Sequence, residues 1–206
     1  MDHEVPKMKP KTDIDALANY IQIQTIRGEK SRFHAYVNAL PDDVDLAFRR
    51  PTSEIVARLP PSWVQEVVNQ RYAVYMRGKQ LGDVETYVKR VSVVHSRVFV
   101  VRALDRRRNE WIPSPALVAG ADMLNLSEHP NTDCETDVDS VFFECKTIKP
   151  IDAGEQLFTP FGRQFASEED RDAYTLVHYG FAQNDFYSAS ANRICTNYAR
   201  MNINVK

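Results

Sequence analysis

The chain has 206 residues, and its 26 Lys and Arg against 28 Asp and Glu give a formal net charge of -2. A nucleic-acid-binding protein usually carries a clear basic excess, so this balance argues against a nucleic-acid partner. The short basic runs at residues 49–50 and 106–108 are interpreted as solvated loop or helix-end charge. No apolar run approaches the roughly 20 residues that a membrane-spanning helix needs, so no membrane partner is predicted.

The first half of the chain is predicted to be helical. Residues 1–12 are polar, contain two prolines and are expected to be loose, and apolar residues recur at helical spacing from Asp13 onward. Asp13 or Asp15 is the candidate N-terminal cap of the first helix, and Gly28 is its expected end. Ser62 is the candidate cap of the longest helix. The predicted helices cover residues 13–27, 33–40, 51–58, 62–78 and 83–100.

Short strands are predicted after a charged connection at residues 105–110. The run 141–148 is rich in β-forming residues, and residues 156–159 form a second candidate strand after a turn at residues 153–155. Residues 116–118 suit a buried strand or a bend. Helices followed by short strands predict an α+β fold, with a mainly helical N-terminal half and a short-stranded, β-rich C-terminal half. The predicted segments are residues 1–12, 13–104 and 105–206.

The three cysteines, Cys134, Cys145 and Cys195, are odd in number and form no CxxC pair. This usage predicts neither a disulfide framework nor a zinc site, and no metal is expected. Reduced thiols point to an intracellular protein, and the polar N-terminus lacks the apolar core of a secretory signal. The cytoplasm, the nucleus and the plastid all stay open as compartments.

Three segments carry the functional signal, and their order matters more than any one of them. They are residues 121–131 (ADMLNLSEHPN), 151–162 (IDAGEQLFTPFG) and 176–181 (LVHYGF). They resemble the motifs D-x-x-N-H, then P-N, then G-E-Q-hydrophobic, then Y-G-F of SET-domain protein methyltransferases. The resembling branch includes the plant Rubisco lysine methyltransferases and the actin-histidine methyltransferase.

Two further segments extend the resemblance toward the N-terminus. Residues 96–99 (SRVF) match the S-R-x-F end of a helical insertion in that branch, and residues 31–41 (SRFHAYVNALP) resemble its beginning. The resemblance therefore covers roughly residues 13–184. It implies that the helical first half is similar to the insertion and the second half is similar to the later part of a SET domain.

The resemblance implies S-adenosylmethionine as the cofactor and a protein-lysine N-methyltransferase acting on a non-histone protein. Histidine is also methylated within this branch, so the expected partner is a protein that presents lysine or histidine. The sequence indicates no oligomeric state. Tyr179 and Phe161, which stands where the family has tyrosine, are the candidate catalytic positions. The implied cofactor contacts are Arg97, Asp122, Asn125, Leu126 and Phe181.

Three departures favour a second interpretation. Leu126 replaces the histidine of the N-H motif, and Phe161 lacks the hydroxyl of the family's tyrosine. The first SET strands, with their Gly-x-Gly-like loop, have no counterpart before residue 13, so these N-terminal strands are expected to be missing. The alternative prediction is a catalytically impaired or truncated SET-derived module that binds a protein.

Ordinary structural roles also remain open for several candidates. Arg97 is equally consistent with a helix-end surface charge, and Tyr179 with a core aromatic whose hydroxyl is satisfied. His129 is more often a simple loop residue than a base or ligand. The acidic residues within 133–139 suit a solvated loop better than a divalent-cation site.

Overall fold

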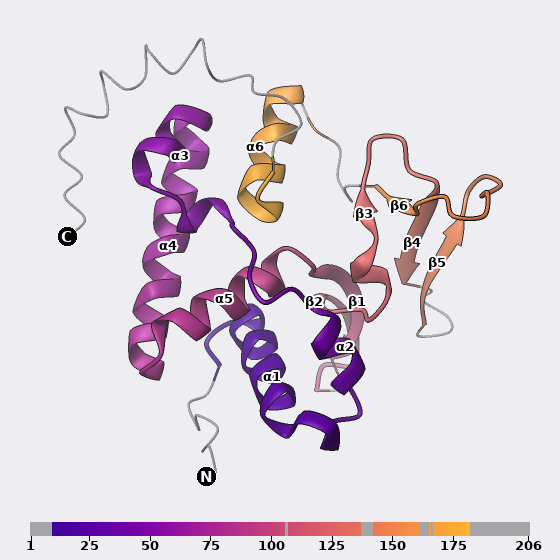
Figure 1. The fold of residues 1–206 in the computed structure, drawn as a ribbon, viewed down its shortest axis with the longest axis horizontal. Coiled ribbons are helices and arrows are strands. Elements are labelled where there is room, and N and C mark those ends of the chain that lie inside the picture. The colour runs from indigo at the N-terminus through magenta and orange to yellow at the C-terminus, as the bar shows by residue number, and fades with distance from the viewer. Residues whose placement is uncertain (1–9, 106, 137–141, 161–164, 166, 182–206) are drawn as a thin grey trace. The chain divides into compact units, whose positions relative to one another are not determined.

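The structure is a computed structural model, and it divides into two compact units that interleave along the chain. The first unit comprises Met1–Pro41 and Arg97–Gln164, and the second comprises Asp42–Ser96 and Phe165–Lys206. Helices dominate the N-terminal half and short strands follow, which confirms the α+β prediction (Figure 1). The predicted segment boundaries at residues 12 and 104 stay a prediction. The described residues are 10–105, 107–136, 142–160, 165 and 167–181.

The helices of the first unit are α1 (Asp13–Arg27) and α2 (His34–Ala39), joined through a short 3-10 turn, η1 (Gly28–Lys30). The cap of α1 is Thr12, not Asp13 or Asp15, because the Thr12 hydroxyl accepts a hydrogen bond from the Asp15 backbone N–H at 3.1 Å. Gly28 ends α1 as predicted. Helix α1 packs against α2 and against strand β2.

Three strand pairs complete the described part of the first unit. Strands β1 (Phe99–Asp105) and β2 (Glu110–Ala116) are antiparallel, as are β4 (Thr132–Thr136) and β5 (Phe143–Thr147). Strands β3 (Asn125–Leu126) and β6 (Phe158–Thr159) run parallel. Strand β1 corrects the predicted helix over residues 83–100. Burial alternates residue by residue along β1, and its backbone groups pair with β2, a partner that helical spacing alone cannot reveal.

The second unit is helical in its described part. Its elements are η2 (Ala47–Arg49), α3 (Thr52–Arg58), α4 (Pro61–Leu81), α5 (Val84–His95) and α6 (Glu168–Tyr179). Helix α4 contacts α3, α5, α6 and η2, so it is the central element of this unit (Figure 1). The fully buried apolar side chains of the second unit include Phe48, Ile55, Leu59, Val64, Val67, Val91, Val94 and Val177.

Both predicted ends of α4 are wrong. The helix begins at Pro61, before Ser62, and it runs to Leu81, where Gly82 with a φ of 79° caps it, beyond the predicted end near Gly78. Gly78 serves packing, because a Cβ there would lie 2.9 Å from the Cα of Val84 at the start of α5. The absence of a side chain at Gly78 lets α4 and α5 approach closely. This packing role explains why the glycine lies within α4 and does not end it.

Helix α6 was not predicted from the sequence. It is capped by Ser167, whose hydroxyl accepts from the Asp170 backbone N–H at 3.1 Å, and acidic residues fill its first turn.

Among the helices of the described residues, none combines the length and the apolar character needed to cross a membrane.

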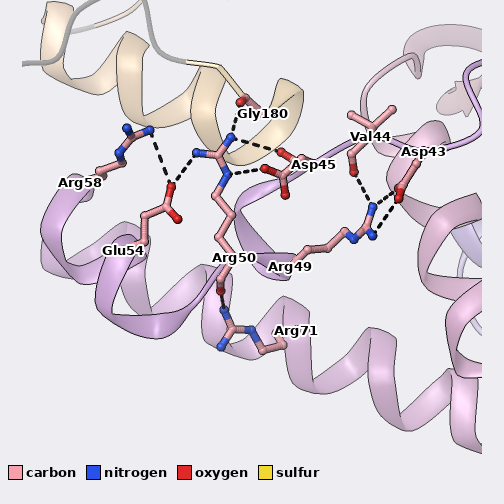
Figure 2. A network of polar contacts seen from close by, with 9 residues as sticks. All are labelled: Asp43, Val44, Asp45, Arg49, Arg50, Glu54, Arg58, Arg71 and Gly180. Atoms are coloured by element: carbon pink, nitrogen blue, oxygen red, sulfur yellow. Dashed lines mark hydrogen bonds and ion pairs between the residues drawn. The ribbon is translucent and has the colours of Figure 1, made fainter.

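The arginines at residues 49–50 are not solvated charge, which corrects the prediction. The Arg50 side chain is only 14% exposed; it donates to the Gly180 carbonyl at 2.7 Å and to Glu54 at 3.0 Å (Figure 2). Arg49 pairs with Asp43 and donates to the Val44 carbonyl at 2.9 Å. Sequence composition cannot reveal this, because it shows neither which nearby carboxylates the two arginines pair with nor that the Gly180 carbonyl lies beside Arg50. Arg107 and Arg108 are exposed, and residue 106 lies outside the described residues.

Cys134 and Cys145 form a disulfide, which corrects the prediction of reduced thiols. They are direct partners in the antiparallel register of β4 and β5. The prediction failed because it counted cysteines, whereas pairing depended on which residues the two strands place opposite each other. The inference of an intracellular compartment loses the support of reduced thiols. Cys195 lies outside the described residues.

Candidate functional site

Arg97 and Asp122 meet in the first unit. Arg97 lies two residues before β1, and Asp122 lies in a 3-10 turn, η3 (Ala121–Met123). The Arg97 Nη1 donates to the Asp122 backbone carbonyl at 2.7 Å and approaches the Met123 Sδ at 3.2 Å. Asp122 is only 6% exposed, so its carboxyl group is largely withdrawn from water. A helix-end surface charge would not make these contacts, and the pair therefore forms a partly buried polar centre.

Tyr36 of α2 completes this centre, and the sequence analysis did not assign it to the site. Its hydroxyl donates a hydrogen bond to the Asp122 Oδ2, across 86 residues of sequence. One sequence feature points toward it, since Tyr36 lies in the segment 31–41 that resembles the start of the family's insertion. The tertiary contact with Asp122 was not visible from the sequence.

Burial sets the electrostatics of the centre. Desolvation raises the pKa of Asp122 above its usual value, and it is opposed by the hydrogen bond from Tyr36 and the charge of Arg97. Desolvation likewise raises the pKa of Tyr36, with Asp122 adding to the effect. The tyrosine is therefore the proton donor in this contact.

Two polar atoms of the centre are buried and have no hydrogen-bond partner among the described residues. They are Arg97 Nε, a donor, and Asp122 Oδ1, an acceptor when the carboxyl is ionised. Buried polar groups are nearly always satisfied in native proteins, so each exception calls for an explanation. An acceptor such as a carboxylate would complement Arg97 Nε, and a donor such as an ammonium group would complement Asp122 Oδ1.

Asn125 and Leu126 follow on β3. Asn125 is exposed and Leu126 is half-buried, and the two residues pair with Phe158 and Thr159 of the parallel strand β6. The Ser127 backbone N–H extends this pairing by donating to the Thr159 carbonyl at 3.0 Å. An exposed Asn125 side chain next to the Asp122 turn is available to a ligand.

Asn131 explains why the first two motif segments belong together. This residue is 1% exposed, and its amide donates to the Gln156 carbonyl at 2.8 Å and to Glu155 Oε1 at 3.1 Å. Its side-chain oxygen accepts from the Phe158 N–H at 2.7 Å. Hydrogen bonds from the Asp152 backbone N–H and from Asn131 lower the pKa of Glu155. The P-N and G-E motifs are thus one structural link that holds β3 beside β6.

Tyr179 and Phe181 belong to the second unit. Tyr179 ends α6, its ring lies 6.0 Å from the ring of Tyr174, and burial and a hydrogen bond with Tyr174 raise its pKa. Phe181 is 41% exposed, with its ring 6.3 Å from that of Tyr179. Between them, Gly180 adopts a φ of 83°, and a Cβ there would lie 2.5 Å from the Asp45 carbonyl oxygen. Phe161 lies outside the described residues.

The remaining candidates show ordinary surroundings. His129 is exposed, and its backbone N–H donates to the Ser127 hydroxyl at 3.0 Å. Asp133 and Glu135 are exposed on β4, and residues 137 and 139 lie outside the described residues. Within the part of the chain that is described, no group of three His, Cys, Asp or Glu residues is arranged to hold a metal ion.

Comparison with known proteins shows similarity of structure without close similarity of sequence. No protein-family model matches the chain, and no curated protein matches it. Rubisco LSMT bound to AdoMet superposes with a TM-score of 0.55 at 16% identity over 87% of this chain. The SET domain of LSMT bound to lysine and AdoHcy superposes with a TM-score of 0.56 at 18% identity. Its complex with methyl-lysine and AdoHcy superposes with a TM-score of 0.50 at 16% identity, and both matches cover 87% of this chain.

The matched region is limited on the side of the solved structures. The chain spans 41% of the length of each of them, about two fifths. The agreement nevertheless includes most of this chain, and it confirms the fold that the ordered motifs predicted. The chain therefore has the fold of part of a SET domain.

Proposed function

We propose that this chain forms an S-adenosylmethionine-dependent protein-lysine N-methyltransferase of the SET type, with a non-histone protein as substrate. The single observation that carries the proposal is the centre at Arg97 and Asp122. Its two unsatisfied buried atoms match an amino-acid group, and the fold is similar to solved SET domains that have AdoMet or AdoHcy bound.

The residues present fit the amino-acid end of S-adenosylmethionine. Arg97 Nε would donate to its carboxylate, a charge-assisted contact, and Asp122 Oδ1 would accept from its ammonium group. Asn125 and the backbone of Leu126 would hold the adenosine part, with Phe181 as the aromatic contact that the resemblance implies. When bound, this cofactor supplies a methyl group on a sulfonium that is already activated toward an attacking amine.

The protein's remaining task is to present a neutral amine in line with the methyl group and to keep water out. We assign the alignment of the amine to Tyr179, whose raised pKa keeps the hydroxyl protonated and able to donate or accept. Phe161 supplies no hydroxyl at the family's tyrosine position. Loss of one positioned hydrogen-bonding group costs about 2–4 kcal/mol in the transition state, so we expect slow turnover.

A SET-derived module that binds a protein without methylating it is the second candidate. Leu126 and Phe161 favour it, because both replace residues on which the family's site depends.

For the methyltransferase, the proposed acceptor is a lysine side chain, with histidine as the alternative. The proposed compartment of the substrate protein is the cytoplasm or the nucleus, and the plastid stays open.

Calorimetry with S-adenosylhomocysteine tests the cofactor site. We expect binding by the unaltered chain, and an affinity about 10- to 100-fold lower for Arg97→Ala, on the scale of hydrogen bonds to a charged group. Arg107→Ala, which changes an exposed arginine of the same unit, is the matched control and should bind normally. Absence of binding at millimolar ligand would exclude the proposed cofactor.

Transfer of a radiolabelled methyl group to protein substrates separates the two candidates. An enzyme that is slowed by the missing hydroxyl should transfer slowly, and Phe161→Tyr should raise its rate. A non-catalytic module should stay at background in both forms. Background transfer by both proteins, with intact cofactor binding, would favour the module.

A further inference from the structure

We infer that Tyr36 is a positioning residue of the cofactor site: its hydroxyl holds the Asp122 carboxylate through Oδ2 so that Oδ1 is left to accept from the ammonium group of the ligand. The inference rests on the proposed function, and it assigns a role to a residue of the helical segment that the cofactor does not need to touch. It starts from a single contact, the hydrogen bond from the Tyr36 hydroxyl to Asp122 Oδ2.

The contact divides the two oxygens of the carboxylate between two tasks. Oδ2 is occupied by Tyr36, while Oδ1 is buried and has no partner within the described residues. Without the hydroxyl, Oδ2 loses its side-chain partner, and the carboxyl group is held less firmly in the orientation that a ligand would meet. A preorganised acceptor binds more tightly because its orientation is fixed before the ligand arrives.

The same contact also favours the ionised form of Asp122. Burial favours the neutral carboxyl, and the groups that oppose it are the Tyr36 hydroxyl from α2, the Arg97 guanidinium, and the backbone N–H groups of Gly120 and Asp122 itself. A protonated carboxyl is a poorer acceptor for an ammonium group. Removing the Tyr36 hydroxyl should therefore raise the pKa of Asp122 and weaken ligand binding most at low pH.

Tyr36 can hold Asp122 in place because α2 is itself held in place. The Ser31 hydroxyl, buried just before α2, donates to Gln24 Oε1 of α1 at 2.8 Å. The Phe33 backbone N–H donates to the Ser31 oxygen at 3.0 Å, which fixes the start of α2. The tyrosine thus projects from an element that is anchored to α1, as a positioning group requires.

The first test compares S-adenosylhomocysteine binding by the unaltered chain and by Tyr36→Phe across pH 6 to 9. We expect the variant to bind about tenfold more weakly near neutral pH, the scale of one hydrogen bond to a charged group. The difference should widen as the pH falls and narrow as it rises. Tyr20→Phe, which removes an exposed hydroxyl from α1, is the matched control and should bind normally.

The second test needs no cofactor. Carbon NMR of the carboxyl groups, assigned with Asp122→Asn, should show a higher pKa for Asp122 in Tyr36→Phe than in the unaltered chain. In the Asp122→Asn background, adding Tyr36→Phe should cause no further loss of affinity, because the two residues act through one contact.

The outcomes are distinguishable. Equal binding by Tyr36→Phe and the unaltered chain at every pH would overturn the inference and leave the proposed function standing. A pH-independent loss, with an unchanged Asp122 titration, would show a purely structural role and would also overturn it. Absence of binding by the unaltered chain would overturn the proposed function and this inference together.

Discussion

Arginines of the two units differ in how completely their donors are satisfied. In the second unit, Arg71 donates to the carbonyls of Phe48 and Arg50 and to the Thr52 hydroxyl. Arg50 Nε is also buried without a hydrogen bond, but it lies 3.2 Å from Asp45, within ion-pair distance (Figure 2). In the first unit, Arg97 leaves a buried Nε with no partner among the described residues.

We expect this difference to distinguish an arginine that stabilises the fold from one that binds the proposed cofactor. An arginine whose donors end on the protein's own carbonyls stabilises the fold, and truncating it leaves those carbonyls unsatisfied. A buried donor without a partner calls for an explanation, and for Arg97 the proposed function supplies one in the form of a ligand. Both kinds are equally basic in sequence, so charge patterning alone could not sort them.

Gly180→Ala should have the largest effect on the second unit. The new Cβ would meet the Asp45 carbonyl oxygen at 2.5 Å, and the residue would have to keep a φ of 83°. Left-handed strain and the clash together should lower the free energy of unfolding by about 4 kcal/mol, measured by urea denaturation.

Gly82→Ala is the matched control for that prediction. Gly82 ends α4 with a φ of 79°, but a Cβ there would meet nothing within 4 Å. It should cost only the conformational strain, about 1 kcal/mol. Equal losses at the two glycines would contradict the role of the Asp45 contact.

Acid should destabilise the second unit through His95. Burial, and the nearby His178, lower the pKa of His95 from 6.5 to about 4, and its ring packs 6.3 Å from that of Phe48. Below pH 6.5, His95 binds a proton in the unfolded chain but stays neutral in the folded chain until about pH 4. The free energy of unfolding should therefore fall from pH 6.5 down to about pH 4, by about 3 kcal/mol in total.

His95→Gln should remove most of this pH dependence in urea unfolding measured at several pH values. His129→Gln changes an exposed histidine of the first unit, and this variant should keep the pH dependence of the unaltered chain. A slope that survives in His95→Gln would assign the acid sensitivity to other groups.

Truncating one arginine in each unit tests the comparison directly, and the expected changes in stability are smaller than those of Gly180→Ala and of acid. Arg71→Met should lower the free energy of unfolding by about 2 kcal/mol, because three acceptors lose a donor. Arg97→Met removes one bond to the Asp122 carbonyl and should cost about 1 kcal/mol. Affinity for S-adenosylhomocysteine should fall more in Arg97→Met than in Arg71→Met. A larger loss of stability in Arg97→Met, or a larger loss of affinity in Arg71→Met, would contradict the comparison.

Local patterns predicted α1, α2 and α3 within one residue at each end, because a helix satisfies its own backbone within the segment. Gly28 ended α1 as expected, and the β-rich run gave β5. Strand β1 was misassigned as helix, because a strand depends on its partner β2. The Cys134–Cys145 disulfide was missed for the same reason, since it depends on the register of β4 and β5.

The candidate site divides in the same way. Arg97, Asp122 and Asn125 were identified from ordered motifs, and the structure places Arg97 against Asp122. Tyr36 was missed because its partner is 86 residues away. The Asn131–Glu155 link also needed the structure, which showed that two motifs separated in sequence form one hydrogen-bonded junction.

By itself, the sequence determined the fold class and the order of motifs that pointed to a SET domain, because spacing and local propensity are written along the chain. The tertiary structure decided which charged residues are paired within the protein and which keep a buried atom without a partner among the described residues. That distinction depends on burial and on partners far away in sequence, which place Arg50 beside Gly180 and Tyr36 beside Asp122.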